Sequence, residues 1–145
     1  MIGIGTLALA YVLSQFYRSF LAVLTPSLIA DLGIDKAGLS AASGAYFIAF
    51  ALAQFPVGVF LDRFGPRRTA AAIMTLGGAG GAFLFSAATA PWMIAVAMAM
   101  IGVGCAPILM ASLFIFAKAY SAARLAALAA WMVAFGTTGT IIGAA

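Results

Sequence analysis

The chain has 145 residues, of which 66% are hydrophobic and 7% are charged, and its mean hydropathy is +1.21. A water-soluble domain with so few charges could not cover this much apolar surface, so the composition indicates a membrane protein. The net charge of +4 comes from scattered cations that flank apolar stretches, which argues against a nucleic-acid-binding surface. Without histidine, and with Cys105 as its single cysteine, the chain is expected to hold no metal, no cofactor and no internal disulfide.

Charged residues divide the chain into apolar segments of about 20 residues, the length that crosses the hydrocarbon core of a bilayer. These segments are apolar on all sides and rich in alanine, leucine, methionine and glycine, so they predict helices and not the alternating strands of a barrel. The expected fold class is therefore an all-α membrane bundle. We expect its spans at residues 4–29, 39–61, 69–88, 92–117 and 125–145.

The connections between these spans carry the charges that set orientation. If Met1 is cytoplasmic, the loops after the second and fourth spans are cytoplasmic too. Lys36 is then the single cation in an outer loop. The positive-inside rule then predicts a multi-pass protein of the cell's inner (plasma) membrane, with residues 62–68 and 118–124 on the same side. The cations of the two cytoplasmic loops are Arg63, Arg67, Arg68, Lys118 and Arg124.

The last apolar segment stops at residues 143–145 without a polar flank or an interfacial anchor. We therefore expect residues 1–145 to be the N-terminal transmembrane half of a larger protein, whose sixth helix and C-terminal half lie beyond this sequence. A complete small membrane protein, acting as a homodimer or structural subunit, is the alternative that the short length favours.

Small residues at helical spacing indicate close helix packing. In an incomplete bundle these faces lack partners, although we expect the face of Gly77 and Gly81 to meet a helix of this chain. The other small-residue faces hold Gly102 and Gly104, and Gly139 and Gly143.

The most specific motif follows the second span and runs from Gly58 to Arg68, with the sequence GVFLDRFGPRR. This string resembles the loop between helices two and three of the major facilitator superfamily, in which a glycine precedes an aspartate-arginine pair, a further glycine and a basic cluster. The resemblance implies that the loop latches two halves of a transporter and gates it. The gating residues would be Gly58, Asp62, Arg63, Gly65, Arg67 and Arg68.

Each part of this motif has a physical role. Gly58 permits the close approach of a helix, Asp62 can interact with a cation or a helix N-terminus, and Gly65 supports the turn. If the latch partner belongs to the C-terminal half, the face of Gly58 should be open in this chain. Pro66 stands where the family often has a basic residue, so the charge network would rest on Arg67 instead. The positive-inside rule alone would also place Asp, Gly and Arg in this loop, but it does not explain their ordered spacing.

Arg18 lies inside the first span, where a cation costs about 2.5–3.5 kcal/mol on insertion scales and should face a cavity or a partner. Tyr11, Ser14 and Thr25 share its stripe of the helix, and Gln15 follows Ser14 directly. We expect Arg18 near mid-depth on the concave side of the bundle. The alternatives are a structural arginine paired with an acid of the missing half and an arginine that snorkels outward.

An arginine in the first helix, followed by Pro26 and an Asp-Leu-Gly turn, resembles the organic-anion and sugar-phosphate permease branch of the family. This resemblance implies a secondary active transporter that works by alternating access, whose arginine binds the phosphate or carboxylate of a small organic substrate. Tyr11, Ser14 and Gln15 would accompany Arg18 in the substrate site. On the second span Tyr46 and Gln54 would line the same cavity, whereas Ser43 is interpreted as a helix contact.

Two other functions are weaker. A drug or proton efflux carrier is disfavoured because Met98 stands where many proton-coupled members of the family carry arginine, and because the span around Gly136 lacks the Gly-Pro pair associated with drug and proton antiporters. An intramembrane enzyme is not expected, since the chain has no histidine, no glutamate and no paired aspartates within a span.

Overall fold

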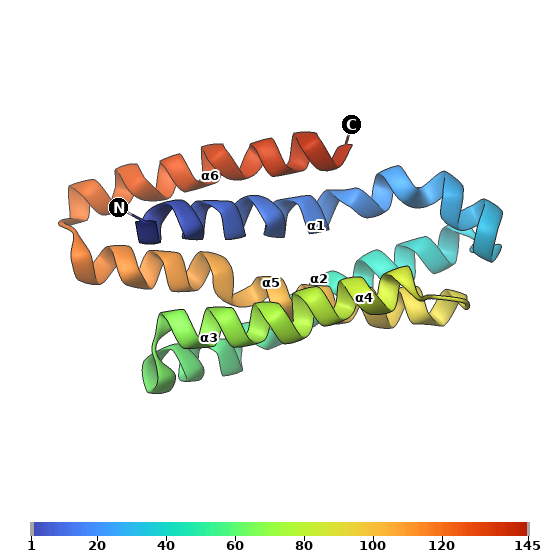
Figure 1. The fold of residues 1–145 in the computed structure, drawn as a ribbon, viewed down its shortest axis with the longest axis horizontal. Coiled ribbons are helices and arrows are strands. Elements are labelled where there is room, and N and C mark those ends of the chain that lie inside the picture. Colours follow the sequence, from blue (N-terminus) through green and yellow to red (C-terminus); the bar gives the residue numbers. More distant parts are fainter. Residues whose placement is uncertain (1, 145) are drawn as a thin grey trace. The chain divides into compact units, whose positions relative to one another are not determined.

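The computed structural model describes residues 2–144, and it describes the side chains of residues 5–122 and 124–144. The described residues contain five helices that are long and apolar enough to cross a membrane, which confirms the all-α fold class (Figure 1). Met1 and Ala145, the ends of the predicted topology, lie outside the described residues. The elements are α1 (Ile2–Leu32), α2 (Lys36–Phe64), α3 (Pro66–Ile73), the π-helical turn η1 (Met74–Ala79), α4 (Gly80–Ser86), α5 (Pro91–Ala119) and α6 (Ala122–Ala144).

Several helices begin or end beyond the predicted limits, because charged residues mark the edge of the hydrocarbon core and not the end of the helix. The carboxylate of Asp35 accepts a hydrogen bond from the Gly38 backbone N–H at 2.7 Å and caps α2, which begins at Lys36 and not at residue 39. Pro91 is the first residue of α5, one residue before the predicted start, since proline fits the first helical position. Gly33, with φ 61°, follows the end of α1 and donates its N–H to the Ile29 carbonyl at 3.1 Å.

The third span is continuous but not uniformly α-helical. Its middle turn, η1, is a π-helix in which the Gly80 N–H reaches back to the Thr75 carbonyl, five residues earlier. The hydropathy pattern does not indicate this turn. It contains Gly77 and Gly78, both buried, and it joins α3 and α4 without a break.

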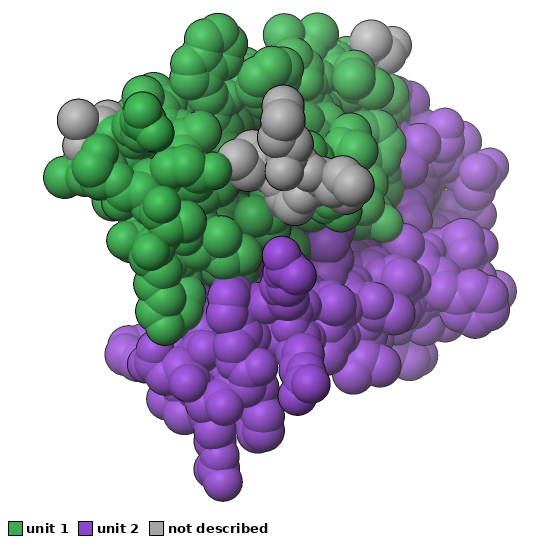
Figure 2. Space-filling view, turned by 60° about the vertical axis from the view of Figure 1, so that its left-hand side comes forward, with its two compact units in different colours: residues 1–23, 108–145 green, residues 24–107 purple. Residues whose placement is uncertain are grey.

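The chain divides into two compact units, coloured separately in Figure 2. Residues 24–107 form one unit, and residues 1–23 and 108–145 form the other. Only α1 and α5 pass from one unit to the other. Pro107 is the last residue of the unit of residues 24–107 and lies within α5, and Pro26 lies close to the passage in α1. Because proline removes a backbone hydrogen bond inside a helix, both passages are weak points of their helices.

In the unit of residues 24–107, the third span packs tightly against α5. A Cβ on Gly77 would lie 2.6 Å from the backbone nitrogen of Gly104, and a Cβ on Gly81 would lie 2.7 Å from Cγ1 of Ile101 and 2.8 Å from the Ala97 carbonyl oxygen. Position 77 therefore meets residue 104 and position 81 meets residues 97 and 101, so the two spans run antiparallel. The expectation that Gly77 and Gly81 face a helix of this chain is confirmed.

In the other unit, α6 lies beside the N-terminal part of α1 (Figure 1). A Cβ on Gly139 would collide with the Val12 backbone, and a Cβ on Gly143 would collide with the Ser19 hydroxyl and approach Phe16. The two helices therefore run parallel, as spans one and five must when every span reverses direction.

The glycine faces of α5 and α6 also have partners within the chain. Gly102 lies against the backbone of Tyr46 on α2, and Gly139 and Gly143 lie against α1. The expectation that an incomplete bundle leaves these faces without partners is therefore wrong. Neighbouring spans of the same chain already pack against these glycine faces, because glycine lets backbones approach closely.

Candidate functional site

The candidate substrate residues of α1 fall on one stripe, and two of them form a hydrogen-bonded pair. Tyr11 and Ser14 are 7% and 8% exposed. The Gln15 side-chain amide Nε2 donates a hydrogen bond to the Tyr11 hydroxyl at 2.8 Å. Arg18, one turn further along, is exposed. Because the Tyr11 oxygen acts as acceptor in this pair, its own proton is available to a further acceptor.

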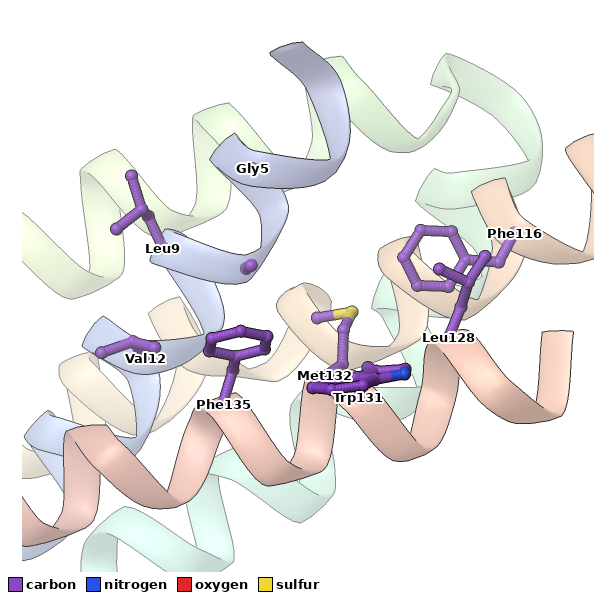
Figure 3. Close-up of a pocket in the computed structure, with 9 residues that line it drawn as sticks. Gly5, Leu9, Val12, Phe116, Leu128, Trp131, Met132 and Phe135 are labelled. Carbon is purple, nitrogen blue, oxygen red and sulfur yellow. The ribbon is translucent and has the colours of Figure 1, made fainter. Parts of the chain in front are cut away.

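An apolar hollow of about 480 Å³ lies in the unit that contains α6, between α1, the end of α5 and α6 (Figure 3). No charged side chain is among the described residues that line it, and these residues offer nothing to balance the desolvation of an anion. A second hollow of about 270 Å³ shares Leu9 and Val12 with it. The first hollow is lined by Gly5, Ala8, Leu9, Val12, Phe116, Leu128, Trp131, Met132 and Phe135.

These hollows lie beside the polar stripe of α1 and do not include its residues. At about 100° per residue, Leu9 lies on the opposite side of the helix from Arg18, but Ala8, which also lines the first hollow, lies only about 20° from Gln15. None of the candidate substrate residues lines either hollow. The hollows therefore border the polar stripe without including it, and the anion-site prediction concerns the stripe alone.

The polar residues proposed on α2 are embedded to different degrees. Tyr46 is 1% exposed, and its ring packs edge-on against Phe47, with centroids 5.2 Å apart, and in stacked geometry with Phe50 at 6.2 Å. Gln54 is half-buried. Both residues belong to the unit of residues 24–107, whereas Arg18 belongs to the other unit. A cavity shared by all of them remains a prediction.

The turn between α2 and α3 depends on Gly65. This residue ends α2, precedes Pro66 at the first position of α3, and has φ 82° and ψ 158°. Its N–H donates to the Leu61 carbonyl at 3.1 Å, and its own carbonyl accepts from the Thr69 N–H at 3.2 Å. The tight reversal thus follows directly from a backbone conformation that glycine supplies.

The charged groups of this loop are presented to the surroundings. Asp62, Arg63, Arg67 and Arg68 are exposed, and the Arg63 guanidinium carbon lies 5.7 Å from the Phe64 ring centroid. A Cβ on Gly58 would meet nothing within 4 Å, so the expectation that its face is open in this chain is confirmed. The gating role of the loop stays a prediction.

Two residues that support the loop and the polar stripe were not predicted from the sequence. Thr69 is 4% exposed, and its hydroxyl donates to the Phe60 carbonyl at 2.9 Å, which ties α3 back to α2. Gly136 lies against the Tyr11 ring. The spacing of Gly136, Gly139 and Gly143, at i, i+3 and i+7, would have placed Gly136 on the face that packs against α1.

Comparison with known proteins agrees with this architecture. The family model of the Major Facilitator Superfamily matches residues 7–145. The chain belongs to the major facilitator superfamily and is a multi-pass membrane protein.

Two curated relatives are each described as a probable hexose phosphate transport protein. The one from Chlamydia trachomatis is 34% identical over 83 residues, and the one from Chlamydia muridarum is 33% identical over 81 residues. These matches cover 57% and 56% of this chain but 18% of each relative. The chain thus matches only a small part of much longer proteins.

Proposed function

We propose that this chain forms the N-terminal transmembrane half of a secondary active transporter that moves a small organic anion, such as a phosphate ester or a carboxylate, by alternating access. Membership of the major facilitator superfamily supports transport. The observation that carries the substrate class is Arg18, an exposed arginine on the polar stripe of a membrane-spanning helix. The relatives described as hexose phosphate transport proteins favour the same chemistry.

The polar face of α1 offers complementary groups for such an anion. The guanidinium of Arg18 can donate two parallel hydrogen bonds to a phosphate or carboxylate. Tyr11, whose oxygen accepts from Gln15, can donate its remaining proton to a substrate oxygen. Ser14 adds a hydroxyl between them on the same stripe. Binding by several donors at low dielectric would favour the anion over its uncharged analogue.

The remaining parts of the proposal concern the whole transporter. The loop from Gly58 to Arg68 would latch against the C-terminal half, which would occupy the open face at Gly58. The cytoplasmic side of the inner membrane would carry this loop, the turn at residues 118–124 and the N-terminus. The partners of the chain would be the substrate, the bilayer and the C-terminal half.

Uptake by purified full-length protein in proteoliposomes tests the proposal. We expect accumulation of a radiolabelled hexose phosphate and inhibition by other sugar phosphates, but no uptake of the free hexose. A lipophilic cationic dye serves as the opposite probe, because a drug efflux carrier would move it. Transport of the dye without transport of any phosphate ester or carboxylate would reject the anion carrier in favour of the efflux carrier.

A further inference from the structure

The face of α6 that packs on α1 carries three glycines, and they do not all meet the same kind of atom. A Cβ on Gly139 would meet the Val12 backbone, whereas one on Gly143 would meet the Ser19 hydroxyl. Gly136 differs because it faces the ring of Tyr11 and the stem of Gln15. This glycine therefore borders the hydrogen-bonded pair of the polar stripe.

The space at Gly136 is already filled by the Tyr11 side chain. A Cβ at this position would collide with Tyr11 Cε1, would lie 2.7 Å from Cδ1 and would lie 3.2 Å from Cγ of Gln15. Cε1 is bonded to the ring carbon that bears the hydroxyl. An added methyl group would thus press on the edge of the ring that carries the hydrogen-bonding oxygen, and on the side chain that donates to it.

Because Tyr11 and Gln15 are largely buried, a displacement of the Tyr11 ring would disturb their hydrogen bond. Tyr11 is 7% exposed and Gln15 is partly buried, so the ring cannot swing freely into open space. Their hydrogen bond, 2.8 Å long, fixes the hydroxyl and the amide relative to each other. Moving either group by a few tenths of an ångström would lengthen or misalign that bond.

We propose that Gly136 is a positioning residue that holds the Tyr11–Gln15 pair in the orientation that the anion site uses. This inference rests on the proposed function, in which Tyr11 and Gln15 accompany Arg18. Gly136 touches no substrate itself. It acts by leaving room for the tyrosine ring, which sets the direction of the hydroxyl proton that remains for the anion.

Fluorine NMR of full-length protein labelled with 3-fluorotyrosine tests the contact without any substrate. The resonance of residue 11 is the one lost in Tyr11→Phe. We expect Gln15→Leu, which removes the amide donor, to shift this resonance, and we expect Gly136→Ala to shift it as well. Thr138→Ala is the matched control on α6, because Thr138 is exposed and its hydroxyl bonds to the Phe135 carbonyl at 2.6 Å. This control should leave the resonance unchanged.

A double-mutant cycle on anion uptake tests the role. Gly136→Ala and Tyr11→Phe should each raise KM by up to about tenfold, the equivalent of one lost hydrogen bond, with the turnover rate kept. The KM of the double variant should be little higher than that of either single variant, because both substitutions remove the same hydrogen bond, from the Tyr11 hydroxyl to the anion. Thr138→Ala should give wild-type KM alone and no coupling with Tyr11→Phe.

The two measurements separate this inference from the proposed function. Multiplicative KM effects of Gly136→Ala and Tyr11→Phe, or an unmoved residue-11 resonance in Gly136→Ala, would overturn the positioning role. A wild-type protein that transports no anion would overturn the proposed function and, with it, the effect on KM. The resonance would still decide whether Gly136 sets the geometry of Tyr11 and Gln15.

Discussion

Two glycines at turns show how single residues determine the path of this chain. Gly33 and Gly65 both have positive φ, 61° and 82°, and a Cβ at either position would meet nothing within 4 Å. Their difference lies in the backbone alone. Gly33 has a φ in the range of the left-handed helical region, which asparagine also visits, whereas Gly65, with ψ 158°, occupies a region that is essentially restricted to glycine.

We therefore expect Gly65→Asn to destabilise the protein by about 1–3 kcal/mol, and Gly33→Asn to have a clearly smaller effect. Thermal unfolding of the two purified variants in the same detergent measures the difference. Equal melting midpoints for both variants would show that the backbone conformation of Gly65 does not limit this turn.

The sequence predicts individual residues where a cost is intrinsic to the residue type. An arginine inside an apolar span must have a reason, so Arg18 stands out from the sequence alone. The role of Gly136 is not visible in this way, because it depends on the tyrosine that the neighbouring helix presents to it. The same holds for Thr69, whose acceptor is the Phe60 carbonyl of the preceding helix.

At the scale of helices, glycines govern how closely two spans approach. The third span meets α5 where Gly77 lies against the backbone of Gly104 and Met100. Gly44 on α2 provides a contrast, because a Cβ there would meet nothing within 4 Å. The same substitution at these two positions therefore has opposite expected effects.

Gly77→Ala should force the third span away from α5 and cost about 1–3 kcal/mol, as overpacking does. Gly44→Ala should be neutral or stabilising by up to about 1 kcal/mol, because alanine is the better helix former. Thermal unfolding and the yield of monodisperse protein provide the readouts. Stability losses of similar size at both positions would contradict the packing described for the third span.

Hydropathy predicts the five spans well because bilayer thickness imposes their length. It does not predict the π-helical turn, since the pattern of apolar residues is nearly the same for an α-helix and for a helix with one widened turn. It also places the start of α2 too late, at residue 39 and not at Lys36, because the cap Asp35 lies outside the apolar run. These details arise from hydrogen bonds and from packing between helices.

At the scale of the whole molecule, the distribution of charge predicts one orientation in the membrane. Cations gather around the turn between α2 and α3 and around the turn between α5 and α6, and Lys36 is the first residue of α2, directly after the turn that follows α1. The native Cys105 is 2% exposed, so an added surface cysteine can report on accessibility. Arg67 and Ser121 are exposed positions in or beside the two proposed cytoplasmic turns.

We expect Lys36→Cys to react with a membrane-impermeant maleimide in intact cells. Arg67→Cys and Ser121→Cys should react only after the membrane is opened. Wild-type protein controls for reaction at Cys105. Labelling of Arg67→Cys and Ser121→Cys from opposite sides would contradict the alternating topology itself, and labelling of both from outside would reverse the orientation.

The central claim is that Arg18 binds the anion that the whole protein transports, and uptake by Arg18 variants tests it most directly. In proteoliposomes of equal protein content, Arg18→Lys should reduce hexose phosphate uptake strongly, since lysine lacks the planar two-pronged donor, and Arg18→Ala should abolish uptake. Arg124→Ala, at an exposed arginine near the start of α6, is the control and should retain transport. Uptake by Arg18→Ala at the wild-type rate, with normal membrane insertion, would contradict the claim.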